Sequence, residues 1–154
     1  MSNVGNSHIE QLCQEHGIRW VRAPRAVDSK ALPTARVVMF ATFTDPLSYY
    51  AALHEIGHVM LHCGLPKEDA QLITREAEAW VWALDNALDD PPPTARRFIA
   101  LALLSYLDCP ELNRHKEQLD SPPVRTMLSR LQRVLADLDQ EGEETGLDSF
   151  VWPR

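Results

Sequence analysis

The chain has 154 residues, of which 45% are hydrophobic, and a formal net charge of −7. This length suits one domain with a real hydrophobic core. No dense run of lysine and arginine is present, which argues against a nucleic-acid backbone as the main partner. Residues 1–15 lack the apolar core of a signal peptide, and no apolar run reaches the length of a bilayer span. We therefore expect a cytoplasmic protein.

The cysteines indicate no disulfide framework. Cys13, Cys63 and Cys109 are scattered and form no CxxC pair. An odd number without close spacing predicts neither paired disulfides nor a cysteine zinc site. We expect buried thiols.

Helix and strand signals are mixed in the first part of the chain. Ser7 begins a capping box that predicts a short helix, ended by Gly17. Residues 18–21 have the composition of a strand, and residues 23–33 form a polar loop interrupted by proline. Residues 35–43 are the strongest predicted strand.

Helices are predicted in the rest of the chain. Asp45 and Pro46 provide an N-cap and a first-turn proline for a helix that runs to about His62. Further helices are predicted over residues 67–88, 94–108 and 121–138.

These elements predict an α+β fold, in which a small N-terminal sheet packs on helices. We expect one domain over residues 1–139 and a mobile acidic tail over residues 140–154. The apolar face of the last predicted helix, residues 124–138, could pair with a second copy, although packing onto the domain is the simpler expectation.

The helix that begins at Pro46 contains the sequence HEIGH, with His54, Glu55 and His58. Two histidines four residues apart lie about 40° apart around a helix axis and about 6 Å apart along it, so both imidazoles can reach one ion. Glu55 is close enough to contact a water on that ion and is a candidate general base. This HExxH pattern is typical of zinc sites. The alternative is a pair of core histidines with satisfied hydrogen bonds.

Gly57 lies inside the same helix. Glycine in a helix interior costs about 1 kcal/mol relative to alanine, so its presence suggests close packing of another backbone. The helix is apolar on nearly all sides, so we expect it to be buried and the metal site to lie in a core cleft.

An acidic third ligand is expected from the next helix. If the two helices pack antiparallel about a turn near Leu65, His54 lies eleven residues before the turn and Glu76 eleven after it, so both are about 16 Å away. Glu76 lies about 80° from the centre of the buried stripe of its helix, and Glu78 about 120°. We therefore favour Glu76 over Glu78. For either residue the alternative is a solvated surface carboxylate.

These residues resemble the ImmA/IrrE family of zinc metallopeptidases. In that family a strand leads into an HExxH helix, often followed by leucine and a further histidine, as at residues 61–62. A later helix carries a Glu-x-Glu/Gln-Ala pattern, as at residues 76–79. The resemblance covers about residues 36–88, about a third of the chain.

The resemblance implies roles for single residues. His54 and His58 match the histidine ligands of zinc, Glu55 the base and Glu76 the acidic ligand. It also implies a zinc-dependent endopeptidase that acts on a regulatory protein, such as a helix-turn-helix repressor encoded beside it. Zinc would lower the pKa of a water to about 7, and Glu55 would take its proton and pass it to the leaving amine.

Two positions depart from related patterns. The family usually has an asparagine four residues after the ligand glutamate, where this chain has Trp80. Asparagine could support a ligand histidine through a hydrogen bond, and Trp80 has a single donor to replace it. The third histidine of metzincins would fall at Gly64, two residues beyond His62. We therefore expect His62 to lie beside the site or in the core.

Two roles and one alternative remain open. Tyr50, Tyr106 and His115 are candidates for the group that stabilises the oxyanion. In similar proteases the strand before the motif helix offers its edge to an extended substrate, and residues 37–43 could do so. The competing function is a non-catalytic protein-binding module in which zinc orders the fold, and the missing asparagine favours it.

Overall fold

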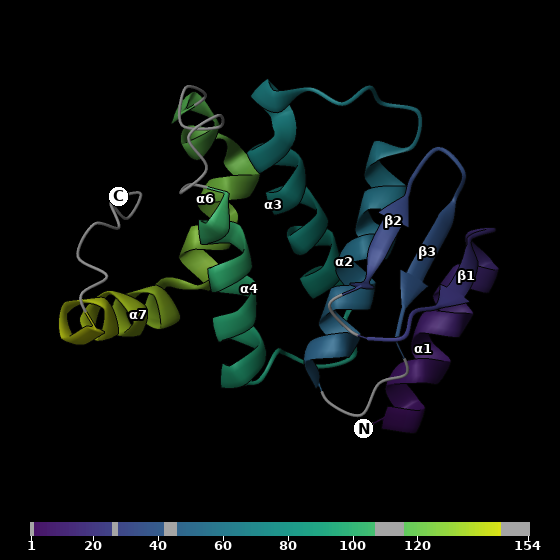
Figure 1. Ribbon diagram of the computed structural model, residues 1–154, viewed down its shortest axis with the longest axis horizontal. Helices are drawn as coiled ribbons and strands as arrows, with labels where there is room; N and C mark the ends of the chain where they lie inside the picture. Colours follow the sequence, from purple (N-terminus) through teal and green to yellow (C-terminus); the bar gives the residue numbers. More distant parts are fainter. Residues whose placement is uncertain (1, 26–27, 42–45, 107–115, 146–154) are drawn as a thin grey trace.

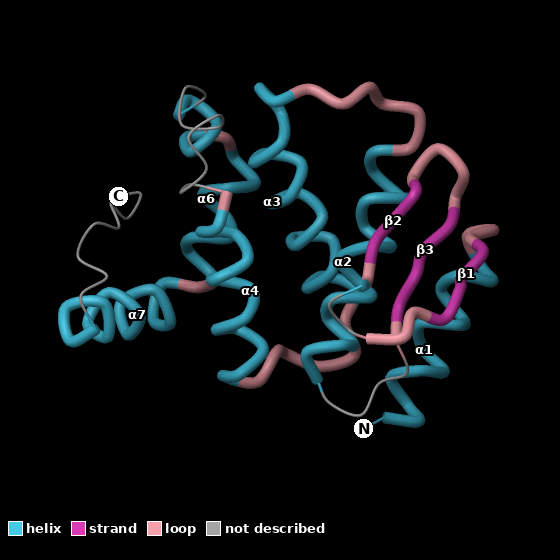
Figure 2. Tube along the Cα trace, in the orientation of Figure 1, coloured by secondary structure: helices cyan, strands magenta, loops and turns pink. Residues whose placement is uncertain are grey.

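A small sheet lies beside a group of helices, which confirms the α+β class (Figures 1 and 2). The computed structural model describes residues 2–25, 28–41, 46–106 and 116–145. In chain order its elements are α1 (Ser2–Glu15), β1 (Arg19–Arg22), β2 (Lys30–Leu32), β3 (Val37–Phe40), α2 (Pro46–His62), α3 (Asp69–Asn86), α4 (Pro93–Ser105), η2 (Lys116–Asp120), α6 (Pro122–Arg130) and α7 (Gln132–Thr145).

The sheet has the strand order β1-β3-β2. Strand β1 is parallel to β3, and β2 is antiparallel to β3 with Ala31 opposite Val38. Helix α2 packs against β2 and β3, and α1 against β1. Val38 and Phe40 of β3 are buried in the core. The central strand therefore connects the sheet to the helix that carries the HExxH motif.

Two expectations about the sheet are wrong. Residues 23–33 were expected to be a loop, but they include β2. This strand has only three residues, too few for an alternating pattern to reveal it. Strand β3, within the predicted segment 37–43, was expected to offer a free edge, but it has a neighbour on each side. The edge strand that packs against α2 is β2.

Helix α1 begins at Ser2, well before the N-cap that its capping signal predicted. Ser7 lies inside the helix rather than at its N-cap. The apolar stripe of Ile9, Leu12 and Cys13 is buried, as expected of a helix packed on the core. Gly17 follows with a φ of +64°, a left-handed conformation that ends the helix at low cost.

Helices α2 and α3 lie side by side and antiparallel (Figure 1). The bounds of α2 agree with the prediction; its expected N-cap, Asp45, lies outside the described residues. A Cβ placed on Gly57 would lie 2.9 Å from the carbonyl oxygen of Ala79 on α3. This confirms that Gly57 allows another backbone to approach, and it fixes the separation of the two helices.

The helix predicted over residues 121–138 is in fact two helices. Helix α6 ends at Arg130, its C-cap Leu131 has a ψ of 5° that departs from helical geometry, and α7 continues in a new direction (Figure 1). Leu131 is 1% exposed, so the chain bends where a buried side chain holds it in the core. Helix α7 also includes residues 140–145, which were expected to belong to a mobile tail. Residues 146–154 lie outside the described part.

The cysteines differ in burial. Cys13 is buried as expected, whereas Cys63 is exposed in the turn after α2. The expected burial of Cys63 is therefore wrong, because that turn lies at the surface rather than in the core. Cys109 lies outside the described residues. Among the helices that the structure describes, none has the length and apolar character needed to cross a membrane.

Candidate metal centre

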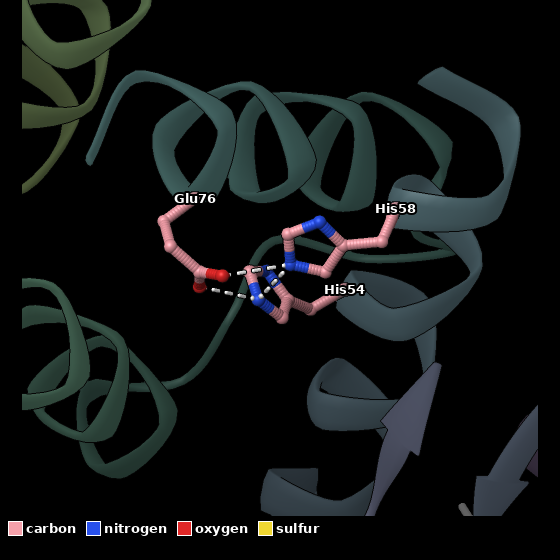
Figure 3. Close-up of side chains that lie close together, drawn as sticks. All are labelled: His54, His58 and Glu76. Atoms are coloured by element: carbon pink, nitrogen blue, oxygen red, sulfur yellow. Dashed lines mark hydrogen bonds and ion pairs between the residues drawn. The ribbon is translucent and has the colours of Figure 1, made fainter. Parts of the chain in front are cut away.

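Three side chains from α2 and α3 point toward one another (Figure 3). The Nε2 atoms of His54 and His58 lie 3.1 Å apart, and each lies 2.9 Å from an oxygen of Glu76. Two ligands about 2.1 Å from a tetrahedral zinc ion are about 3.4 Å apart, so these atoms have nearly the spacing that one ion requires. The donor atoms all lie within 4.8 Å of one another.

The two helices position these three residues. His54 and His58 are on successive turns of α2, and Glu76 faces them from α3 because the helices run antiparallel. The close approach of Gly57 to Ala79 keeps the two backbones near enough for a glutamate side chain to reach both imidazoles. The His54 side chain is 8% exposed and that of Glu76 13%, so solvent screens their interaction weakly.

The electrostatics keep the carboxylate of Glu76 ionised. Burial acts to raise the pKa of Glu76, but hydrogen bonds from His54 and His58 outweigh it and hold this pKa well below its usual range. Burial lowers the pKa of His54, against the opposing effect of Glu76. Burial also acts to lower the pKa of His58. A hydrogen bond to Glu76 and the negative charges of Glu76, Glu55 and Glu78 outweigh this effect, so the pKa of His58 is raised. An anionic ligand is therefore present at neutral pH.

Glu55 lies beside this group and not within it. Burial, together with the charge of Glu76, raises the pKa of Glu55 to about 7. Two contacts act to lower this pKa. One is the charge of His58, and the other is a hydrogen bond that the backbone N–H of Ala31 donates to the carboxylate. Strand β2 thus orients Glu55. A carboxyl group with a pKa near neutrality is suited to accept and return a proton.

Trp80 occupies the position where the related family usually has asparagine. Its ring stacks on that of His54, with centroids 4.0 Å apart and an interplanar angle of 27°. In the described part of the structure, the buried Nδ1 of His54 has no hydrogen-bond partner. Histidines that bind a metal usually donate this second nitrogen's proton to a carboxylate, carbonyl or water. Trp80 therefore supports His54 by packing and does not supply that hydrogen bond.

His62 contacts the site from one turn beyond His58. Its Nδ1 lies 2.9 Å from Nδ1 of His58, whose Nε2 points toward Glu76. Burial, together with the positive charges of His58 and Arg75, lowers the pKa of His62 to about 4, so its ring is neutral at pH 7 and its Nδ1 can accept a hydrogen bond from His58. This agrees with the expectation that His62 lies beside the ligands.

The three candidates for oxyanion stabilisation have different positions. The hydroxyl of Tyr50 donates to the carbonyl oxygen of Asp89 at 2.7 Å, away from the cleft, so Tyr50 is not brought to the site. Tyr106 lines the cleft, and its hydroxyl interacts with Glu76. Burial and the charges of Glu76 and Glu55 raise the pKa of Tyr106, so it remains a donor at neutral pH. His115 lies outside the described residues.

An open cleft of about 640 Å³ gives access to these residues. Its walls come from β2, α2, α3, α4 and the turn between α2 and α3. Sequence patterns did not reveal β2 or the cationic side chains Lys30, Lys67 and Arg75, which also line the cleft. These come from separate elements, so no spacing in the sequence connects them.

Comparisons of the chain with protein-family models, with curated proteins and with solved structures found no match. The likeness to the ImmA/IrrE family therefore depends on the motif residues alone.

Proposed function

We propose that this chain is a zinc-dependent endopeptidase that cleaves a regulatory protein. The observation that carries the proposal is the convergence of His54, His58 and Glu76 beside the Glu55 carboxyl in an open cleft. Two histidines and one glutamate leave a fourth position free on a tetrahedral ion, which is the ligand set of several hydrolytic zinc sites. A closed structural site would use four protein ligands.

The side chains around the site supply the remaining chemistry. Zinc held by His54, His58 and Glu76 would polarise a peptide carbonyl and lower the pKa of a water. Glu55, a carboxyl group beside the three ligands, would take the proton from that water and return it to the leaving amine. Tyr106 is a hydrogen-bond donor on the cleft wall and is our candidate for stabilising the oxyanion.

The position of β2 suggests how a polypeptide would bind. This edge strand lines the cleft, and the N–H of its Ala31 donates a hydrogen bond to Glu55. An extended segment could add to this edge through backbone hydrogen bonds, with the scissile bond held near Glu55. Strand β2 thus takes the role first expected of residues 37–43.

One observation favours a second candidate function. The unpartnered Nδ1 of His54, beneath Trp80, differs from the usual support of a catalytic ligand. The alternative is a non-catalytic module that uses zinc to order the fold and binds a regulator. The two functions differ in whether the bound partner is cut.

The test compares wild-type protein with Glu55→Gln, both loaded with zinc. Each is incubated with any helix-turn-helix protein found to be encoded beside the gene, and the products are identified by mass spectrometry. We expect wild type to cut one of them. Glu55→Gln should retain zinc and lose at least about 100-fold in rate, because an amide is a poor base and Glu55 is not a ligand.

A matched control is Glu78→Gln, which removes a partly exposed carboxylate 3.7 Å from Nε2 of His62. This variant should still cut the substrate. If wild type and Glu55→Gln both bind a partner tightly and neither cuts it, the binding-module function replaces the endopeptidase.

A further inference from the structure

The charges that line the cleft differ from those of the chain as a whole. The chain has 22 acidic residues against 15 lysines and arginines. Among the described residues that line the cleft, the carboxylates are Glu55 and Glu76, both at the metal centre, whereas Lys30, Lys67 and Arg75 are cationic. A divalent ion would balance the two carboxylates. The rest of the cleft then has an excess of positive charge in an acidic protein.

Two of these cations lie together at one end of the cleft. Nη1 of Arg75 donates a 2.6 Å hydrogen bond to the carbonyl oxygen of Pro66, the residue before Lys67. Arg75 is also close enough to His62 to lower the pKa of that histidine. This end of the cleft therefore lies beyond the metal centre in the direction in which α2 runs. We call Lys67 and Arg75 the basic end.

Two aromatic side chains line the opposite end of the cleft. Trp80 stacks on His54, and Phe98 of α4 meets Trp80 edge-on with ring centroids 6.4 Å apart. Phe98 is 38% exposed although it is a large aromatic residue, and Ala102 lies one turn further along α4 on the same wall. We call Trp80, Phe98 and Ala102 the apolar end. The metal centre lies between the two ends.

We propose that the cleft selects an extended acidic polypeptide, with a carboxylate side chain at the basic end and an apolar side chain at the apolar end. Carboxylates form strong bidentate hydrogen bonds with guanidinium groups, and Lys67 adds a second charge. Lys30 on β2 adds positive charge along the strand wall. The inference rests on the proposed function in one respect, which is that this polypeptide is then the substrate.

A polypeptide fits the cleft better than a nucleic acid, which is also anionic. The cations lie on three separate elements, β2, α3 and the turn before α3, and do not form a track that follows regularly spaced phosphates. The edge of β2 offers backbone groups to an extended chain.

The experiment uses zinc-loaded Glu55→Gln protein, which should bind peptides without cutting them. Fluorescent peptides of one length share a central phenylalanine and carry glutamate, glutamine or lysine two residues before or after it. Anisotropy should show that glutamate on one side improves binding by about tenfold over glutamine, with lysine weakest. Added salt should reduce this preference, because the basic end is partly exposed.

Substitutions locate the preference. Lys67→Glu, made in the Glu55→Gln protein, should remove the advantage of glutamate and improve binding of the lysine peptide. The matched control is Arg133→Glu, the same type of charge reversal at an exposed position on α7. It should leave peptide selectivity unchanged. Circular dichroism checks that both variants fold.

The outcomes separate this inference from the proposed function. Equal binding of all three peptides, or no binding, would overturn the inference even if wild type proves to be an endopeptidase. If the peptides bind with a preference for glutamate but wild type cuts no protein, the endopeptidase proposal is overturned and the inference about the cleft stands. A single-stranded oligonucleotide that binds more tightly than the glutamate peptide would show that the cleft recognises phosphate and would overturn the choice of polypeptide.

Discussion

Glu76 and Glu78 are neighbours on α3 that make different contacts. Glu76 contacts both histidines of the motif, whereas the nearest oxygen of Glu78 is 3.7 Å from Nε2 of His62. Glu76→Ala should weaken zinc binding by more than about tenfold, because it removes an anionic ligand. Glu78→Ala should change it little. Competition titration with a chelator measures both, and the reverse order of effects would assign the ligand to Glu78.

Trp80 affects both stability and the metal centre. It is 3% exposed and stacks on His54, so Trp80→Ala should destabilise the protein by about 3–5 kcal/mol through lost packing and should also weaken zinc binding. Trp80→Phe keeps an aromatic ring on the imidazole and should retain zinc affinity within a few fold. Chemical denaturation and chelator competition provide the two measurements. Equal loss of zinc affinity in both variants would argue against support by stacking.

At the scale of elements, the approach of α2 to α3 depends on one glycine. Helix propensity alone predicts that Gly57→Ala stabilises the protein by about 1 kcal/mol. The added Cβ would lie 2.9 Å from the carbonyl oxygen of Ala79, so we expect net destabilisation and weaker zinc binding as the helices separate. Urea unfolding of the metal-free protein distinguishes the two directions. A stabilised variant with unchanged zinc affinity would show that the contact relaxes without cost.

Some helices and strands could be predicted from the sequence and others could not, for physical reasons. Helix α2 could be predicted because Pro46 marks its start and apolar residues continue along it. Strand β2 could not be predicted, because three residues are too few to show the alternation of apolar and polar side chains that marks a strand. The bend at Leu131 was missed because an apolar stripe continues through both α6 and α7, and periodicity does not report a change in helix direction.

In the whole molecule, some contacts of the site could be predicted from the sequence and others could not. The juxtaposition of Glu76 with His54 followed from antiparallel pairing about a short turn, which is a local property of the chain. The contact of Glu55 with Ala31 and the grouping of cleft cations could not be predicted in this way, because they depend on how distant elements meet. Ligand geometry was therefore more predictable than the substrate-binding surface.

A metal ion bound between α2 and α3 is required for the proposed activity. Elemental analysis of protein purified without chelators or added metal, followed by zinc titration of the metal-free form, tests it most directly. We expect one zinc per chain in wild type and almost none in a His54→Ala, His58→Ala double variant, with a rise in melting temperature on zinc binding only in wild type. Two results would contradict a metal site at these residues. One is a wild-type protein that folds normally and binds no zinc, and the other is a double variant that binds zinc as tightly as wild type.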